Sequence, residues 1–425
     1  FYPAFDGDPY FKDFIEDQTV KLSEWQNYFG ENGEGPTALA EYFGNFMIVN
    51  GIIWTRMRVI NRTYRLRLLN GCDSRFLAIE FCKAGEDGKD CEDTTRLTFH
   101  VIGGDQGLAD EPKLTERLLI ETGARYDVII NFSDSDIDKR IIMKNLGGDK
   151  PFNGDIGVNQ VFDFTDRIMA FDVNACQDEE CDDVSPIKAN TSFASFGPRV
   201  GDPTMSNSPR RVGLFEGSDE FGRLQPLLGT IDSATDFEGN TIYWPDEDIY
   251  RDHGLIGPMN GTMSWHNPTT ENPAIDTVEE WEIWNLSGDA HPIHLHLVHF
   301  EVLGRYDITW DDETNEDDRV LGDDPVSSTG TYLKSQSVVG HHDSIGNGFR
   351  VMNPTRTEDS HLDPEDGYIE NMPKDVVTAL PNQVTVIKAK FDEPGRYVWH
   401  CHILSHEDHE MMRILHVGSG YENAE

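Results

Sequence analysis

The stretch W-H-C-H-I-L-S-H-E-D-H-E-M-M, residues 399–412, decides the fold expected for this chain. Within it, Cys401, His406 and Met411 offer a thiolate, an imidazole and a thioether from one strand and the loop that follows it. A soft thiolate, imidazoles and a weak thioether are the ligands of a blue-copper electron-transfer site. The order Cys, His, Met, in a loop that closes a β-sandwich, is typical of that site. The stretch therefore predicts a copper centre at the end of a β-sandwich.

Both neighbours of the cysteine are histidines. Alternate side chains of a strand point to opposite faces, so His400 and His402 face away from Cys401. The two histidines can therefore serve a second metal site behind the first. Cys401 would then join the two sites covalently and provide a short path for single electrons.

A second histidine-rich stretch, H-P-I-H-L-H at 291–296, can supply the missing ligands. His291 can provide the second imidazole of the copper centre from a neighbouring strand. His294 and His296 are two residues apart and share a direction. With the pair that flanks the cysteine, four imidazoles can converge on the second site. Zinc is the rival metal, but it would not need the methionine or explain four additional imidazoles.

Short apolar and β-branched runs, separated by Gly, Pro, Asn and Asp, dominate the rest of the chain. Several of them, such as 64–69 and 126–130, alternate with period two as half-buried strands do. Strands at this spacing favour β-sandwiches or Greek-key barrels, so we expect an all-β fold. The expected divisions are a connecting segment at 1–40, a β domain at 41–175, a linker at 176–209, and a second β domain at 210–425 with insertions near 230–260 and 307–380.

The chain has 425 residues and a formal net charge of -42, from 77 acidic and 35 basic residues. Such a charge repels phosphate backbones, so nucleic acid is excluded as a partner. Self-repulsion of this size is screened by high salt, which favours a salt-adapted (halophilic) protein. An ordinary acidic secreted protein and a carboxylate-lined site for cationic substrates stay open as alternatives. No apolar run reaches the roughly 18 residues of a membrane span.

Six cysteines bear on the compartment. Cys82 and Cys91 flank one short acidic loop, and Cys176 and Cys181 flank another. Local disulfides at both loops would place the protein in an oxidising compartment, so we expect a secreted or extracytoplasmic location. Cys72 is left over and is interpreted as a small buried thiol.

The histidine motifs H-P-I-H-L-H-L-V-H-F at 291–300 and H-C-H-I-L-S-H-E-D-H-E-M-M-R at 400–413 resemble those of the multicopper oxidases. The similarity is greatest to the branch of the spore-coat laccase, bilirubin oxidase and phenoxazinone synthase. Weaker similarity extends to 47–54, 65–70 and 123–130. The resemblance implies tandem cupredoxin-like domains, matching the second and third domains of a three-domain enzyme, with copper as the cofactor.

The resemblance also implies a role for each ligand. These roles are type 1 copper for His291, Cys401, His406 and Met411, type 2 copper for His294, and type 3 copper for His296, His400 and His402. His406 would be the exposed edge where substrate electrons enter. Glu407 matches a carboxylate that helps to deliver protons during O2 reduction.

Two departures from the family pattern qualify this expectation. The first family domain carries two further H-x-H motifs, and the chain has none beyond those at 294–296 and 400–402. We therefore expect that the N-terminal domain is missing and that a complete enzyme would hold four coppers. Asp289 stands where bilirubin oxidases carry a tryptophan, which argues against bilirubin as substrate.

The expected activity is laccase-like. One-electron oxidation of phenolic or aminophenolic donors would be coupled to the four-electron reduction of O2 to water. The partners are then a small-molecule reductant, O2 and the missing domain. Oxidation of Mn(II) or Fe(II), which needs carboxylates beside His406, is an alternative. An isolated blue-copper electron-transfer fragment that reduces no O2 is another.

Overall fold

The computed structural model describes residues 41–157, 165–177, 200–201, 203, 209–218, 224–244, 246, 257–265, 267–310, 332–335, 338–340, 343–345, 348–351, 354–357 and 367–418. Over these residues the regular structure is nearly all β. The helices within them are α4 (Leu404–Glu407) and the short 3-10 turn η1 (Asp134–Asp136). The prediction of an all-β fold is confirmed.

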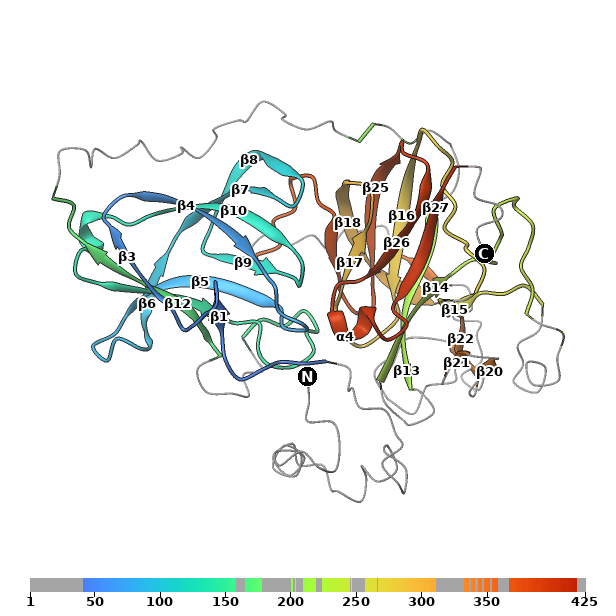
Figure 1. The fold of residues 1–425 in the computed structure, drawn as a ribbon, viewed down its shortest axis with the longest axis horizontal. Helices are drawn as coiled ribbons and strands as arrows, with labels where there is room; N and C mark the ends of the chain where they lie inside the picture. The colour runs from blue at the N-terminus through green and yellow to red at the C-terminus, as the bar shows by residue number, and fades with distance from the viewer. Residues whose placement is uncertain are drawn as a thin grey trace, which may run out of the picture.

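The first half of the described chain forms a sandwich of two sheets, seen in blue to green in Figure 1. One sheet has the order β4-β10-β7-β8, and the other has the order β3-β12-β11-β5-β6, with β9 paired to β5. A two-stranded hairpin, β1-β2, precedes them. The strands are β1 (Ile48–Val49), β2 (Ile52–Ile53), β3 (Arg56–Ile60), β4 (Thr63–Leu69), β5 (Leu77–Ala84), β6 (Cys91–Leu97), β7 (Phe99–Gly104), β8 (Gly107–Thr115), β9 (Arg117–Ile120), β10 (Arg125–Asn131), β11 (Arg140–Asn145) and β12 (Arg167–Asn174).

Strand β10 shows why the sequence folds in this way. Tyr126, Val128 and Ile130 are buried, while the residues between them are partly exposed. This alternation places one apolar face against the opposite sheet, as the pattern at 126–130 predicted. Phe81 and Phe99 fill the space between the sheets, with ring centroids 5.1 Å apart. Burial of such side chains contributes about 1.5–3 kcal/mol each.

The second sandwich pairs a seven-stranded sheet, of order β15-β14-β13-β16-β25-β18-β23, with a four-stranded sheet of order β24-β17-β26-β27. Trp281 packs against Phe391 and Trp399 between the sheets, with ring centroids 5.8 and 6.0 Å apart. Two hairpins, β19-β22 and β20-β21, lie outside the sandwich. The strands are β13 (Arg210–Ser218), β14 (Leu224–Thr230), β15 (Gly261–Met263), β16 (Thr277–Asn285), β17 (His291–Leu295), β18 (Phe300–Trp310), β19 (Tyr332–Ser335), β20 (Val338–Gly340), β21 (Asp343–Ile345), β22 (Gly348–Val351), β23 (Pro354–Arg356), β24 (Val376–Ala379), β25 (Gln383–Phe391), β26 (Gly395–Cys401) and β27 (Met412–Val417).

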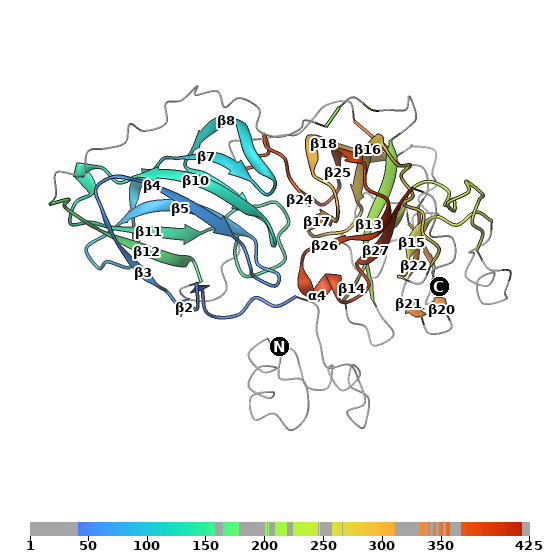
Figure 2. The ribbon, with the colours of Figure 1, turned by 45° about the horizontal axis from the view of Figure 1, so that its top comes forward.

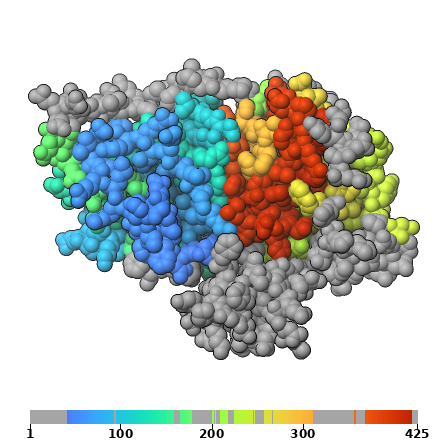
Figure 3. Space-filling view, in the orientation of Figure 1, coloured from blue at the N-terminus to red at the C-terminus, as the bar shows by residue number. Residues whose placement is uncertain are grey.

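The two sandwiches lie side by side, with α4 and β17 of the second facing the first (Figures 1 and 2). Their surfaces meet in the space-filling view of Figure 3. The segment 367–376, which leads into β24, crosses this contact. Leu119 donates its backbone N–H to the carbonyl of Gly367 at 3.0 Å, and Gln106 donates to that of Pro373 at 3.1 Å. Strand β9 and the β7–β8 turn of the first sandwich therefore bind the segment that leads into the four-stranded sheet of the second.

Several sequence predictions bear on this architecture. The boundaries after residues 40, 175 and 209 fall in or beside segments outside the described residues, so the division into domains stays a prediction. The disulfide between Cys82 and Cys91 is present, which confirms that pairing. The pairing of Cys176 with Cys181 cannot be followed, since Cys181 lies outside the described residues.

Cys72 carries a free, half-buried thiol. No helix within the described ranges has the length and apolar character needed to cross a bilayer.

Candidate metal centres

Two neighbouring strands carry the histidine motifs. β17 and β26 are antiparallel, with Ile293 opposite Cys401 and His294 opposite His400. β26 runs directly into α4, and the backbone N–H of Cys401 donates to the carbonyl of Met411 at 3.0 Å. That hydrogen bond closes the loop between the two residues, so Cys401, α4 and Met411 gather at one end of the sheet.

The outer group of this site consists of Cys401, His291 and His406. The Cys401 Sγ lies 3.6 Å from His291 Nδ1 and 3.9 Å from His406 Nδ1, and the two nitrogens are 3.3 Å apart. The three ligand atoms therefore converge on one point, and all three side chains are buried. Met411 is also fully buried. A sulfur and two imidazole nitrogens in a dry pocket fit a soft, redox-active metal such as copper.

Burial sets the protonation of this outer group. It lowers the pKa of His291 to about 4, opposed by the charge of Asp289, and lowers the pKa of His406 to about 3, with the charge of His291 acting in the same direction. Burial also raises the pKa of the Cys401 thiol well above its usual value. At neutral pH both imidazoles are thus uncharged and able to bind a metal, whereas the thiol must lose its proton when the metal binds.

An inner group of imidazoles lies on the opposite face of β26. The ligand nitrogens of His294, His296 and His400 all lie within 4.8 Å of one another, and His296 Nε2 is 3.1 Å from His400 Nε2. His402 lies beside this group but outside it, with its ring centroid 5.6 Å from that of His400. Of the four histidines that strand alternation predicted to converge, His294, His296 and His400 lie together, and His402 lies at their edge.

Hydrogen bonds orient two of the inner rings. His294 Nδ1 lies 2.7 Å from the carbonyl of Asp375, and His400 Nδ1 lies 2.9 Å from the carbonyl of Cys401. A carbonyl oxygen can only accept, so each Nδ1 carries the proton and each Nε2 keeps its lone pair for a metal. Burial lowers the pKa of His294 to about 4, which keeps this ring neutral.

Glu407 stands beside the inner group, as expected for a proton-handling carboxylate. Its Oε2 is 3.1 Å from His400 Nδ1. Burial tends to raise the pKa of Glu407, but the hydrogen bond and charge of His400 outweigh it and leave the pKa below its ordinary value.

Comparison with known proteins agrees with this geometry. The sequence model of a family described as multicopper oxidase matches residues 233–339 and 345–420, which hold all of the histidines and the cysteine described above. This chain belongs to the multicopper oxidases.

Several individual multicopper oxidases are similar over most of the chain. The bilirubin oxidase of Albifimbria verrucaria is 30% identical over 388 residues, which cover 91% of this chain and 49% of that protein. The laccase of Bacillus subtilis (strain 168) is 26% identical over 385 residues, covering 90% of this chain and 56% of the laccase. The chain thus spans about half the length of these curated relatives.

Solved structures show the same fold. The McoA multicopper oxidase from the hyperthermophile Aquifex aeolicus superposes with a TM-score of 0.50 at 20% identity, covering 90% of this chain and 60% of that one. Its 2F4 variant gives a TM-score of 0.51 at 21% identity, covering 91% of this chain and 62% of the variant.

In this multicopper oxidase, carboxylates surround the outer group. Glu41 Oε1 lies 3.3 Å from His406 Nε2, and Glu216 Oε1 lies 3.4 Å from His291 Nε2. Asp289 is close enough to both carboxylates that burial and their charges raise its pKa to about 8. Sequence reasoning noted Asp289 only as a departure from bilirubin oxidases. No sequence pattern pointed to Glu41 or Glu216, because both lie far along the chain from Cys401 and His406.

The expectation that His406 is an exposed edge is wrong. The side chain of His406 has no exposed surface, because Glu41 lies over its Nε2. Glu41 is held there by its backbone N–H, which donates to Ser405 Oγ at 3.0 Å. Electrons that reach His406 must therefore pass the carboxyl group of Glu41 or the atoms around it.

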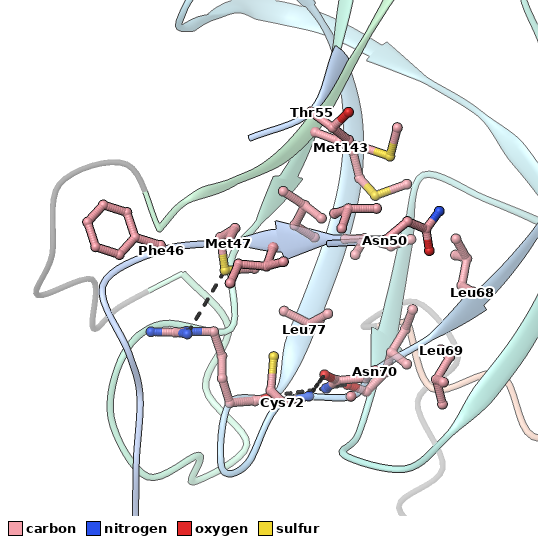
Figure 4. Close-up of a pocket in the computed structure, with 18 of the residues that line it drawn as sticks. Phe46, Met47, Asn50, Thr55, Leu68, Leu69, Asn70, Cys72, Leu77 and Met143 are labelled. Carbon is pink, nitrogen blue, oxygen red and sulfur yellow. Dashed lines mark hydrogen bonds between the residues drawn. The ribbon is translucent and has the colours of Figure 1, made fainter. Parts of the chain in front are cut away.

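A groove of about 1120 Å³ begins beside this outer group, on the first sandwich. Figure 4 shows Met47, Leu69, Cys72 and Leu77 lining it, from the segment around β1, from β4 and from β5. Leu404 of α4, two residues before His406, also lines the groove. The lining is largely apolar, so the groove suits an apolar or aromatic molecule.

Proposed function

We propose that the protein is a copper-dependent oxidase that takes single electrons from a reductant at the outer group and uses them to reduce O2 to water at the inner group. The observation that carries this proposal is the position of Cys401, an outer ligand, directly between His400 and His402. One peptide unit therefore connects Cys401 to each of these two histidines, and so links the outer sulfur to the inner imidazoles. Copper, when bound, supplies the one-electron redox chemistry and the binding of O2.

The geometry of the two groups and the family resemblance support a role for each ligand. The proposed type 1 ligands are His291, Cys401, His406 and Met411, the proposed type 2 ligand is His294, and the proposed type 3 ligands are His296, His400 and His402. The chain's own residues hold these rings neutral and oriented, and exclude water from the outer group. Glu407, whose carboxylate lies beside the protonated Nδ1 of His400, would accept protons and pass them on to reduced oxygen. Four coppers would be bound when the inner group is completed by further imidazoles.

We assign phenolic or aminophenolic compounds as the electron donors. The largely apolar groove, whose lining includes Leu404 two residues before His406, supports this assignment, because it could hold an aromatic ring. Since Glu41 covers His406, the electron would pass from this ring to His406 without direct contact between them.

Oxidation of a metal ion such as Mn(II) or Fe(II) is a second candidate. It needs carboxylates beside the outer imidazoles, and Glu41, Glu216 and Asp289 meet that need. Hard cations prefer carboxylate oxygens. The pKa of Asp289 is raised partly because Glu216 and Glu41 repel its negative charge. A cation bound among the three carboxylates would relieve this repulsion.

The overall proposal is tested by counting copper, recording the absorption spectrum and replacing Cys401. We expect a strong blue band and about four coppers per chain in active protein. Cys401→Ser should abolish the band and lower oxidase turnover at least ~100-fold, because the path for electrons is lost. One copper per chain, with a blue band and no O2 consumption, would favour an electron-transfer protein. Turnover retained by copper-loaded Cys401→Ser would refute the proposal.

Glu41→Gln separates the two classes of donor. If metal ions are the donors, the variant should lose at least ~10-fold in kcat/KM for Fe(II) or Mn(II), because one anionic ligand is gone. If phenols are the donors, their oxidation should change less than ~3-fold. Steady-state O2 consumption with each donor provides the comparison. The control is Glu238→Gln, which removes the charge of an exposed carboxylate bound to Asn240.

A further inference from the structure

The segment 374–376 joins the two sandwiches through an ion pair. Arg125, at the start of β10 in the first sandwich, donates from Nη1 to Asp375 Oδ1 at 2.8 Å and from Nη2 to Oδ2 at 2.6 Å. Gln106, in the β7–β8 turn, donates to Asp375 Oδ2 at 2.5 Å. This two-pronged contact fixes both the position and the plane of the Asp375 carboxylate.

The backbone of the same segment is held as firmly as the side chain. The N–H groups of Asp375 and Val376 donate to Asp105 Oδ2 at 3.2 and 3.3 Å. Lys374 has no exposed side-chain surface, and its Nζ lies 3.3 Å from Asp105 Oδ2 and 3.3 Å from Glu121 Oε1. The two N–H groups on either side of Asp375 are therefore held by the first sandwich, whereas the carbonyl of Lys374 accepts from the backbone N–H of Phe300 in the second, at 2.8 Å.

The carbonyl of Asp375 points the other way, toward the inner group. It accepts from His294 Nδ1 at 2.7 Å and from the backbone N–H of Leu295 at 3.2 Å. Because the carbonyl can only accept a hydrogen bond, the proton must be on His294 Nδ1, and Nε2 is left unprotonated. The Asp375 Oδ1 is 3.7 Å from the same Nδ1, so a shift of the carboxylate would disturb this ring directly.

We propose that Arg125 and Asp375 are positioning residues for His294: the ion pair between the sandwiches holds the Asp375 carbonyl in place, and this carbonyl fixes the orientation and tautomer of the imidazole. The first sandwich thus sets the geometry of a metal ligand that it does not contain. The proposal rests on the function proposed above for the inner group, but the orientation of the ring can be measured without metal.

The first test uses metal-free protein labelled with ¹⁵N in its histidine rings. We expect His294 to be in the Nδ1–H tautomer, with a slowly exchanging ring proton; the resonance is assigned by its loss in His294→Gln. In Arg125→Met this proton should exchange at least ~10-fold faster and the tautomer population should become mixed. Arg125→Lys keeps the charge but not the two-pronged contact, so it should restore only part of the protection.

A matched control separates positioning from simple loss of an ion pair. Arg65 pairs with Asp127 of the same strand, β10, with Nε donating at 2.8 Å, but on the solvent side. Arg65→Met makes the same change of charge and side chain, and should leave the His294 resonance unaltered. An unaltered His294 resonance in folded Arg125→Met would overturn the proposal, as would equal changes in both variants. If Arg125→Met does not fold, Asp375→Asn, which weakens the same contact, is judged by the same criterion.

A second readout uses copper ions added to the same variants. In Arg125→Met the blue band should persist while the type 2 electron paramagnetic resonance signal is lost or its hyperfine splitting changes. Copper affinity at the inner group should fall by about 10–100-fold, the usual effect of removing an orienting partner. Loss of the blue band together with the type 2 signal would mean general damage and would count against the proposal. If the parent chain binds no copper at the inner group, the proposed function fails, while the resonance of His294 still decides the role of Arg125.

Discussion

At the scale of single residues, the outer group is notable for the carboxyl group of Asp289. Burial and the charges of Glu216 and Glu41 raise its pKa to about 8. Burial, together with the charges of Glu216 and Asp73, also raises the pKa of Glu41 well above its usual value. Acidic groups in this state destabilise the metal-free fold when they ionise, because each charge is partly desolvated and faces another of the same sign.

The effect of Asp289 on stability should depend on pH in a defined direction. A carboxyl whose folded pKa lies above its unfolded value favours the fold at low pH, and that advantage is lost as pH rises through about 8. In metal-free protein, Asp289→Asn should thus raise the free energy of unfolding by about 2 kcal/mol at pH 8.5 and by much less at pH 4.5. Urea unfolding at the two pH values measures this difference. A larger gain at pH 4.5 would contradict the burial of this group.

At the scale of structural elements, the turn between β9 and β10 of the first sandwich contacts His402, at the edge of the inner group. Thr122 Oγ1 donates to the carbonyl of His402 at 2.7 Å. Gly123 has a φ of +81°, and a Cβ added there would lie 2.4 Å from His402 Cδ2. Only glycine allows the backbone to pass this ring so closely.

Gly123→Ala should therefore displace His402. We expect at least a ~10-fold loss of metal affinity at the inner group, with the blue band retained, in addition to about 1–2 kcal/mol of backbone strain. Gly157→Ala is the matched control, since Gly157 also has a positive φ, of +90°, but nothing lies within 4 Å of an added Cβ. Equal copper affinity in the two variants would show that the contact with His402 has no role. Copper titration and urea unfolding give both quantities.

The elements also show how far sequence reasoning reaches here. The alternation around Cys401 predicted which histidines share a face, because strand geometry is local. The strand at 126–130 was predicted for the same reason. In contrast, Glu41 reaches His406 through a contact between distant segments, and no local pattern encodes it. The burial of His406 could not be predicted for the same reason, because Glu41, which covers it, belongs to a distant part of the chain.

At the scale of the whole molecule, the net charge of -42 is the dominant property. The contact between the two sandwiches is crossed by buried ion pairs, those of Lys374 with Asp105 and with Glu121. Repulsion over the surface opposes the compact state, whereas buried pairs are little affected by dissolved ions. Salt should therefore stabilise the protein as a whole and leave the contact between the sandwiches intact.

We expect the free energy of unfolding at pH 7.5 to rise as KCl is increased from 0.05 to 1 M, because the Debye length falls from above 10 Å to about 3 Å. The same series near pH 4.5, the isoelectric point of the sequence, is the control, and the effect of salt should shrink there. Thermal or urea unfolding followed by circular dichroism measures both series. A stability at pH 7.5 that does not change with KCl would argue against adaptation to salt.

The contact of Glu41 with Ser405 has a consequence for biosynthesis. The two residues are 364 positions apart, and their hydrogen bond holds Glu41 over the outer ligand His406. At about 5–20 residues per second, the ribosome needs roughly 20–70 s to make the chain between them. Cys401 and its neighbouring ligands are made after Glu41, so copper can be inserted only once they have also emerged. Glu41 then closes over a site that is either already loaded or open to a metallochaperone.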